Sequence, residues 1–374
     1  MITVIGESLV DRVYAAAPLP EPLSSAVAAG GGAGGAAGGR SAAGDPVAEG
    51  GPTAVDDLAA GARAAAVDRP VAGARGSAVD HPGGSPANVA VGLARLGAPV
   101  TLITQLGEDA NGRLLRDHLA ASAVPVTVAP GPATATSTAT AFLDAQGAAR
   151  YDFRVTWDLP APPDLPTGTR CLHTGSLATA LDPGAEAIEE LLTRTRAEAR
   201  GITISLDPNV RPALLPARDT ARARIERQVA LADIVKVSEE DVAWLYPEQD
   251  VTAVARRWQR TGPALVVVTL GGAGSLAVTA THTVRRPAPS ITVADTVGAG
   301  DAFTAGMLHW LDGAELLGGT SDDAPASLRT LGPDELAALL DLAATTAALT
   351  CTRPGANPPT RGELEDFRQM HARW

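Results

Sequence analysis

Apart from a first strand at its N-terminus, the sequence alternates from residue 81 onward between short apolar runs and amphipathic stretches of helical length. This alternation restricts the fold more than any other feature. The apolar runs are rich in β-branched residues, which favour strands, and strands joined by helices form a parallel sheet covered on both faces. The chain is therefore predicted to be an α/β protein. We expect strands near residues 2–6, 99–107, 171–178, 201–209, 233–238 and 265–272, and helices near residues 85–97, 111–124, 184–199, 219–231, 239–246, 254–260, 302–311, 333–350 and 360–371.

Two stretches interrupt this alternation. Residues 134–144 and 148–157 read as two strands around a turn at 145–147, which predicts a hairpin in a small separate sheet. Residues 26–50 contain nine alanines and nine glycines. Glycine loses much backbone entropy on ordering and alanine buries little surface in return, so an insertion over about residues 22–75 is expected to be disordered. The whole chain, 1–374, is predicted to form a single domain that contains this insertion.

Charge and cysteine content exclude several classes of protein. With 30 Lys and Arg against 42 Asp and Glu, the formal net charge is −12, which argues against a nucleic-acid partner. Cys171 and Cys351 are too few for a disulfide framework or a multi-cysteine zinc site. No uninterrupted apolar stretch reaches about 18 residues, and the N-terminus lacks a signal-peptide pattern. We expect a cytoplasmic protein with no membrane partner.

The segment DTVGAGDAFTAG, residues 295–306, carries the strongest chemical signal. A glycine-rich turn leads into a helix, whose free N–H groups and dipole attract an anion, and Gly298 and Gly300 allow close approach. Asp301 is either a base that takes a proton from the group attacking a phosphate, or the N-cap of the helix. A Walker-A loop is excluded because the single lysine, Lys236, lies in the run VKV. A nicotinamide-binding fingerprint fits less well because GAGDAF lacks its third glycine.

This segment and HPGGSPANVAVGLARLGAPVTLITQLGEDANG, residues 81–112, resemble the two signatures of the ribokinase-like (PfkB-type) sugar kinase family in the family's order. The resemblance covers the chain except for about residues 22–75. It implies a three-layer sandwich with a central, mostly parallel sheet flanked by helices, and a small β-sheet lid over about residues 11–20, 76–83 and 126–158. Further matching segments are GESLVD (6–11), DPNVRP (207–212), TLGGAGSL (269–276) and CTRPGANP (351–358).

The resemblance implies roles for residues on the acceptor side. Asp301 corresponds to the family's catalytic base for the acceptor hydroxyl. The amides of Ala299, Gly300 and Asp301, with Gly298 in the same turn, would form the anion hole for the γ-phosphoryl group. Asn88 is expected to bind the sugar, the alternative being a buried amide that caps a turn. The full set of expected sugar-binding residues is Asp11, Gly83, Gly84, Asn88, Arg154 and Asp301.

The same resemblance implies an ATP site and two metal sites. Asp241 is expected to serve Mg²⁺ through water, with Glu239 and Glu240 as alternatives in the same acidic run. Asp295 resembles the ligand of a monovalent cation such as K⁺, the alternative being a turn residue that accepts backbone N–H groups. The expected ATP-binding residues are Asn209, Ser238, Thr269, Gly271, Gly274, Gly298, Gly300 and Asn357.

The implied activity is transfer of phosphate from ATP to a sugar hydroxyl, so the expected partners are ATP and a small sugar. Ribokinases carry Lys after the Gly-Gly pair where this chain has Ser85, and several segments resemble the fructokinase-like branch, which favours fructose or a related ketohexose. The hairpin would bring Arg154 and Trp157 to the sugar, and an arginine there keeps 2-keto-3-deoxygluconate open. A nucleoside kinase and a catalytically inactive sugar-binding regulator also stay open. A homodimer through the lid is a further expectation.

Overall fold

The computed structural model describes residues 1–14, 78–131, 135–143, 149–198, 201–319 and 326–371. The insertion expected at 22–75 lies outside the described residues, as do residues 15–20 of the expected lid and the turn at 145–147. Within the described part of the chain, no helix is both long and apolar enough to cross a membrane.

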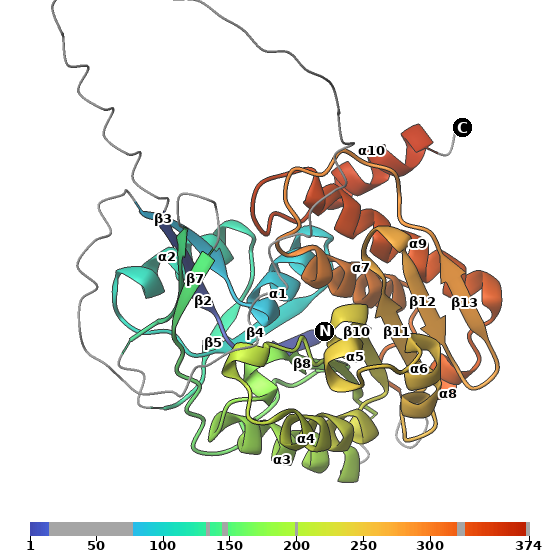
Figure 1. Cartoon of the computed structure of the whole chain (residues 1–374), viewed down its shortest axis with the longest axis horizontal. Coiled ribbons are helices and arrows are strands. Elements are labelled where there is room, and N and C mark those ends of the chain that lie inside the picture. Colours follow the sequence, from blue (N-terminus) through green and yellow to red (C-terminus); the bar gives the residue numbers. More distant parts are fainter. Residues whose placement is uncertain (15–77, 132–134, 144–148, 199–200, 320–325, 372–374) are drawn as a thin grey trace, which may run out of the picture.

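The central sheet has nine strands in the order β13-β12-β11-β10-β9-β8-β1-β4-β5 (Figure 1). From β11 to β5 in this order, each strand is parallel to the next, whereas β12 is antiparallel to both β11 and β13. The mostly parallel sheet predicted from the alternation is confirmed. Its strands are β1 (Ile2–Ile5), β4 (Val100–Thr104), β5 (Val126–Val128), β8 (Cys171–Gly175), β9 (Thr203–Asp207), β10 (Ile234–Ser238), β11 (Leu265–Thr269), β12 (Ser275–Val278) and β13 (Thr283–Arg286).

Helices cover both faces of this sheet (Figure 1). In β11, Leu265 and Val267 pack with the helices of one layer, and Val266 and Val268 pack with those of the other, because successive side chains of a strand point to opposite faces. The sheet is therefore the middle of three layers, as predicted. One layer holds α1 (Ser85–Arg95), α7 (Ala299–Gly313) and α9 (Pro333–Cys351), and the other holds α3 (Gly184–Ala197), α4 (Arg218–Leu231), α5 (Glu239–Leu245) and α6 (Val251–Gln259).

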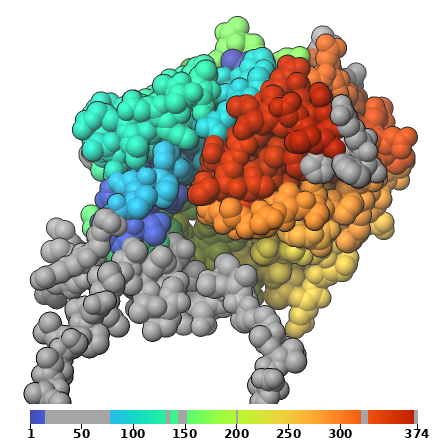
Figure 2. Space-filling model, turned by 90° about the horizontal axis from the view of Figure 1, so that it is seen from above, coloured from blue at the N-terminus to red at the C-terminus, as the bar shows by residue number. Residues whose placement is uncertain are grey.

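Small residues allow the helices of the first layer to pack closely. A Cβ on Gly92 of α1 would lie 2.6 Å from Cβ of Ala305 in α7, so the two helices approach almost backbone to backbone. At the far end of α1, Leu96 packs with leucines of α9 and of α10 (Arg361–His371). Figure 2 accordingly shows the light-blue to cyan residues that follow residue 78 against the red C-terminal helices. The described chain also contains α2 (Ala110–Ala121), α8 (Ala326–Arg329) and 3₁₀ turns at Ser176–Thr179, Pro212–Leu214 and Gly271–Ala273.

A second, four-stranded sheet has the order β3-β2-β6-β7 and is made of β2 (Leu9–Tyr14), β3 (Ala78–Gly83), β6 (Ser137–Leu143) and β7 (Ala149–Arg154). The predicted hairpin is its β6–β7 pair. The lid segment expected at 126–158 begins too early, because β5 pairs in parallel with β4 in the central sheet. Helix α2 brings the chain back to the edge of the sheet at which β4 starts. The next strand, β5, therefore runs parallel to β4 before the chain leaves the central sheet.

The topology defines where a ligand would bind. Strand β1 lies between β4 and β8, so the chain leaves β1 on one side and later returns to it on the other. Ligands of open α/β sheets bind at the carboxyl ends of strands at such a reversal. The short connections that follow β1 lead into the small sheet and α1, which places β2, β3 and the start of α1 at this end.

Candidate active site

The predicted anion-binding turn forms at the start of α7. Gly298 has a φ of +76°, a left-handed conformation that glycine adopts without strain, and a Cβ there would lie 2.6 Å from Cβ of Ala356. Ala299 donates its N–H back into the turn, to the carbonyl of Thr296 at 3.2 Å. The amides of the next two residues are left as donors of the helix N-terminus. The anion site that the sequence predicts with three amides therefore has two in this arrangement.

Asp301 lies within the first turn of α7 and points toward α1. Its Oδ1 accepts a hydrogen bond from Oγ of Ser85 at 2.6 Å, and its Oδ2 accepts one from Nδ2 of Asn88 at 2.8 Å. The residue is 9% exposed, and burial raises the pKa of its carboxyl. The N-cap of α7 is Gly298, so the alternative interpretation of Asp301 as the cap is wrong. Asn88 contacts the predicted base rather than capping a turn.

The acceptor side is formed by β2, β3 and the start of α1. A Cβ added to Gly83 would lie 2.2 Å from Oδ2 of Asp11, so this carboxylate rests on the glycine. Gly84 has a φ of +99°, and a Cβ there would lie 2.6 Å from the backbone carbonyl oxygen of Glu7, in the connection after β1. Burial raises the pKa of Asp11 to about 6, and the negative charge of Asp301 contributes in the same direction. Asp11 and Asp301, from distant segments, are therefore close enough for their charges to interact.

The packing of Asp11 on Gly83 leads to a prediction. Alanine at Gly83 would displace the carboxylate while leaving the strand intact, because the clash is with the end of a side chain rather than with backbone. We expect Gly83→Ala to raise KM for the sugar by about tenfold, the cost of one charge-assisted hydrogen bond, with kcat and Tm little changed. Steady-state kinetics measures this. Gly313→Ala, whose added Cβ meets open space, is the matched control. An unchanged KM in Gly83→Ala would contradict the placement of Asp11.

A cavity of about 710 Å³ adjoins this site. Ser176, Asn209 and Arg211 line it, and Leu177 lies between it and the small sheet, where it packs with Leu9. Ser176 and Asn209 have φ values of +55° and +40°, a conformation that non-glycine residues seldom adopt. The positive charge of Arg211 acts on Asp11. None of the predicted sugar-binding residues lines the cavity itself, so it borders the acceptor side only through Leu177 and Arg211.

The structure removes Arg154 from the predicted sugar contacts. Through β6, Arg154 is in register with Val10, whereas Asp11 is in register with Phe153. Because side chains alternate between the two faces of a strand, Arg154 lies on the face of the small sheet opposite to Asp11. Its side chain is 74% exposed and lies 3.7 Å from Asp152. Phe153, which was not among the predicted sugar contacts, is a β7 residue on the same face of the sheet as Asp11.

Trp157 is likewise a core residue rather than a sugar contact. It is 2% exposed, and its Nε1–H donates to the carbonyl of Ala178 at 3.0 Å. A Cβ on Gly184 would lie 2.2 Å from its ring. The sequence pattern of the hairpin did not reveal that the chain enters the core three residues after β7 ends.

The predicted ATP-binding residues follow neighbouring strands. Asn209 follows β9, Ser238 ends β10 and Thr269 ends β11, and the last two are in register. Parallel strands end at one edge of the sheet, so these residues share the edge at which α7 begins. Gly274 has a φ of +100°, and a Cβ there would clash with a backbone carbonyl at 2.0 Å. Oδ1 of Asn357 accepts from Arg95 at 2.5 Å, which fixes the C-terminal loop against α1.

The two predicted metal ligands hold backbone in place. Asp241 accepts N–H groups from Val210 at 2.9 Å and from Ser238 at 3.1 Å, and with Ser238 it forms a capping box at the start of α5. Asp295 accepts from Val297 at 3.0 Å and from Gly355 at 2.7 Å, which joins the α7 turn to the C-terminal loop. Among the described residues there is no cluster of three or more His, Cys, Asp or Glu that could hold a metal ion.

Comparison with known proteins agrees with this geometry. Residues 57–361 match the pfkB family of carbohydrate kinases. The chain belongs to this family. It is 39% identical over 245 residues to a fructokinase of Rhizobium leguminosarum bv. trifolii (63% of this chain, 73% of that protein) and 36% identical over 281 residues to one of Klebsiella pneumoniae (73% and 87%). The structure of a fructokinase from Xylella fastidiosa with bound ATP superposes with a TM-score of 0.69 at 26% identity, covering 99% of this chain and 98% of that one.

Family membership makes this chain a sugar kinase and confirms the predicted fold, family and enzyme class. In this pfkB kinase, sequence reasoning missed Ser85, which donates to the predicted base Asp301, and the buried pair Lys236–Asp207. Ser85 was noted only as a substitution after the Gly-Gly pair. Lys236 lies in an apolar strand, so nothing in its neighbours indicated that its side chain reaches the start of α7.

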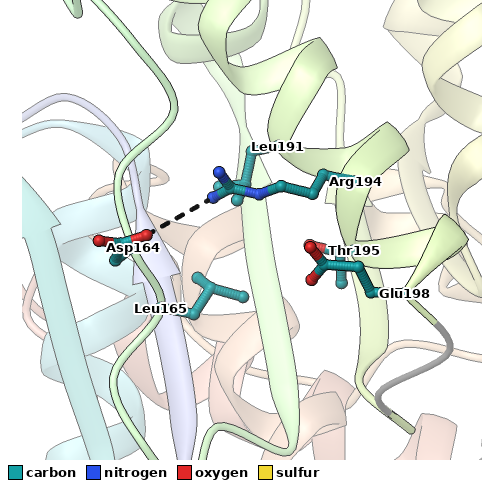
Figure 3. A pocket seen from close by; sticks show the side chains of 6 residues that line it. All are labelled: Asp164, Leu165, Leu191, Arg194, Thr195 and Glu198. Carbon is teal, nitrogen blue, oxygen red and sulfur yellow. Dashed lines mark ion pairs between the residues drawn. The ribbon is translucent and has the colours of Figure 1, made fainter.

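A second pocket of this kinase lies away from these residues (Figure 3). It measures about 260 Å³ and lies between α3 and residues 164–165. Its ion pair joins Arg194 and Asp164 at 4.0 Å. None of the predicted site residues lines it, so the pocket is not part of the candidate active site.

Proposed function

We propose that this kinase transfers the γ-phosphoryl group of ATP to a hydroxyl of fructose or a related ketohexose. The observation that carries the proposal is the carboxylate of Asp301 at the start of α7, which Ser85 and Asn88 hold in place and whose charge acts on Asp11. Asp301 lies beside the free amides that suit a phosphate, and Asp11 lies on the small sheet where a sugar hydroxyl can reach it. The relatives at 36–39% identity are fructokinases, which supports a ketohexose as the acceptor.

In the proposed reaction Asp301 takes the proton of the acceptor hydroxyl. The hydroxyl oxygen forms a bond to the γ-phosphorus as the bond from that phosphorus to the β–γ bridging oxygen breaks, and ADP leaves. Ser85 and Asn88 hold the carboxylate so that its remaining lone pairs face the acceptor. The amides of Gly300 and Asp301 donate to the oxygens of the transferring group, and one such donor contributes about 3–4 kcal/mol.

Nucleotide binding would use the strand ends described above, the turn at the start of α7 and the C-terminal loop. The residues are Asn209, Ser238, Thr269, Gly271, Gly274, Gly298, Gly300 and Asn357. Mg²⁺ is normally held by substrate phosphates with one or two carboxylates and several waters, and it supplies positive charge that offsets phosphate repulsion. Asp241 fits such a role through water, since each oxygen keeps a lone pair beyond its backbone hydrogen bond. Glu239, half-buried near Gly271, is another acidic side chain at this edge.

K⁺ at Asp295 is a separate part of the proposal. This carboxylate joins the α7 turn to the C-terminal loop, and a positive charge there would fix the turn that carries the anion site. We expect the rate to rise when K⁺ replaces a large organic cation at constant ionic strength, and Asp295→Ala to lose the response. Steady-state rates in the two salts measure it. Equal wild-type rates would show that Asp295 acts as a turn residue.

Arg211 gives one observation in favour of an acidic sugar. It lines the cavity of about 710 Å³, and its charge acts on the carboxylate of Asp11. With Arg154 on the opposite face, Arg211 is the arginine through which 2-keto-3-deoxygluconate would be recognised. The inactive sugar-binding regulator is disfavoured because Asp301 and the turn are both in place.

A coupled assay of ADP release tests the proposal across acceptors. The panel holds fructose, 2-keto-3-deoxygluconate, ribose and inosine, each at saturating ATP and Mg²⁺. The proposal predicts the highest kcat/KM with fructose. Preference for 2-keto-3-deoxygluconate together with loss of that preference in Arg211→Ala would assign the acidic sugar instead. Preference for inosine would assign a nucleoside kinase.

We further propose a homodimer through the small sheet. Strand β3 lies at an edge of this sheet, and Val79 on it is 52% exposed. Light scattering on the full chain measures the state. Replacement of Val79 by Lys should shift a dimer toward monomer.

A further inference from the structure

Lys236, the single lysine of the chain, is buried in the central sheet directly against the first turn of α7. Its neighbours Val235 and Val237 pack with the α3–α6 layer, so the alternation of β10 directs Lys236 to the face that α7 covers. Nζ lies 2.9 Å from Oδ2 of Asp207, and the two side chains are 5% and 1% exposed. A Cβ added to Gly300 would lie 3.0 Å from the same Nζ. The ammonium therefore contacts the turn that carries the predicted anion site.

The position is an unfavourable one for a lysine on structural grounds. Burying an ammonium is costly, and a buried ion pair often contributes less to stability than apolar side chains of the same volume. The N-terminus of α7 also carries the positive end of the helix dipole, which repels a cation. The residues next to Lys236 in β10 are apolar, so the packing of the strand does not require a charge at this point.

Several acidic groups make the charge tenable. Asp207 on β9, Asp241 on α5 and Asp301 on α7 all raise the pKa of Lys236, against the effect of burial. His173 on β8 also faces this cluster, but burial lowers its pKa to about 4, so it adds no charge at neutral pH. The pKa of Asp301 is raised by burial and by Asp207, and Lys236 opposes both. One cation is thus set among three carboxylates at the place where phosphates are expected.

We propose that Lys236 is a positioning residue for phosphoryl transfer: anchored on Asp207, its ammonium supports Gly300 and offsets the negative charge that Asp301 and the phosphates of ATP bring together. The inference rests on the proposed function, since it assigns the residue a part in that reaction. Lys236 acts through the turn and through Asp301 and does not touch the acceptor. Without it, phosphates arriving at Gly300 would face Asp207, Asp241 and Asp301 with no buried positive charge among them.

The first test separates this role from that of a structural ion pair. Lys236→Met alone would leave Asp207 buried and unpaired, so the variant to use is the double replacement Lys236→Met with Asp207→Asn, which removes both charges. We expect it to fold, with kcat reduced about 10²-fold. KM for the sugar stays near the wild-type value. The acid limb of the kcat profile moves to higher pH, because Lys236 lowers the pKa of Asp301 more than Asp207 raises it, so loss of the cation outweighs loss of the anion.

The matched control removes another pair from the same sheet. Arg196 contacts Asp233 at 2.8 Å, and Asp233 is 1% exposed at the start of β10, at the opposite edge from α7. Arg196→Met with Asp233→Asn should lower Tm without moving the acid limb. A Lys236/Asp207 double variant that keeps kcat within threefold and leaves the limb in place would overturn the inference, while a wild type without sugar kinase activity would instead overturn the proposed function.

A second measurement needs no variant and no turnover. Protein grown with ¹⁵N-lysine has one side-chain ammonium signal, because the chain has one lysine. We expect this signal to shift on addition of Mg²⁺ with a non-hydrolysable ATP analogue and to stay in place with adenosine, which lacks the phosphates. Calorimetry shows which concentrations of the analogue saturate the nucleotide site. An ammonium signal whose chemical shift does not change at these concentrations would overturn the inference, even if the double variant fails to fold.

Discussion

Asp301→Asn is expected to reduce kcat by about 10²- to 10⁴-fold while leaving ATP affinity nearly unchanged. The reason is geometric. Asparagine keeps the volume of the side chain and an oxygen that can accept from Ser85, and Asn88 can rotate its amide to face the new NH₂ group. The first turn of α7 therefore stays in place, with its two free amides. What is lost is a group able to accept the proton of the acceptor hydroxyl.

Steady-state kinetics with ATP and sugar, together with calorimetric titration of the nucleotide, would measure the two effects separately. Asp312→Asn is a suitable control, because Asp312 lies on the same helix and pairs with Arg170. It should leave kcat unchanged. A near-normal kcat in Asp301→Asn would show that the carboxylate serves the structure of the turn and not the chemistry.

Asp11→Ala is expected to lower kcat/KM for the sugar by about 10- to 150-fold, the range for loss of a hydrogen bond to a charged group. Most of the change should appear in KM, because Asp11 lies on the small sheet and away from the amides that contact the phosphate. The pH dependence follows from the same group. Burial raises the pKa of Asp11 to about 6, so the carboxylate is ionised above that pH and protonated below it. Wild-type KM for the sugar should therefore rise as the pH falls through about 6.

Asp80→Ala offers the matched control for Asp11→Ala. Asp80 lies on β3 of the same sheet and pairs with Arg12 at 2.6 Å, on an exposed surface. Its removal should change KM little, since exposed pairs contribute about 0–1 kcal/mol. If both variants raised KM equally, the effect would belong to the stability of the small sheet. If the wild-type KM for the sugar did not change between pH 5 and 7, the carboxylate of Asp11 would not be the group that accepts a hydrogen bond from the sugar.

The strand–helix alternation predicted the central sheet and most of its helices because apolar period and turn residues are local signals. LVVVT, buried on both faces, is such a case. The assignment of β5 was wrong because three residues carry too little pattern to distinguish a strand of the central sheet from one of the small sheet. The Ala/Gly-rich insertion lies outside the described residues and stays a prediction.

At the site, residues inside long motifs could be predicted and residues outside them could not. Asp301 and Gly298 belong to DTVGAGDAFTAG, where spacing alone places a turn and a helix. The prediction that Arg154 contacts the sugar was wrong because the face on which Arg154 lies depends on the register of β6 with β2. These two strands are more than 120 residues apart in the sequence. Lys236 was missed because its contact with Gly300 joins β10 to α7 across the sheet, a relation that no local pattern carries.

Transfer of phosphate from ATP to a sugar hydroxyl at Asp301 is the central step of the proposed function. Phosphorus NMR of a reaction containing ATP, Mg²⁺ and fructose, with ADP and sugar phosphate quantified together, measures that transfer. The wild-type enzyme should form one fructose phosphate for each ADP and release almost no ADP when the sugar is omitted, and Asp301→Asn should form neither product at a comparable rate. Release of ADP without an equal amount of fructose phosphate would contradict the proposed function. Equal amounts of product from the wild type and from Asp301→Asn would contradict the role of Asp301.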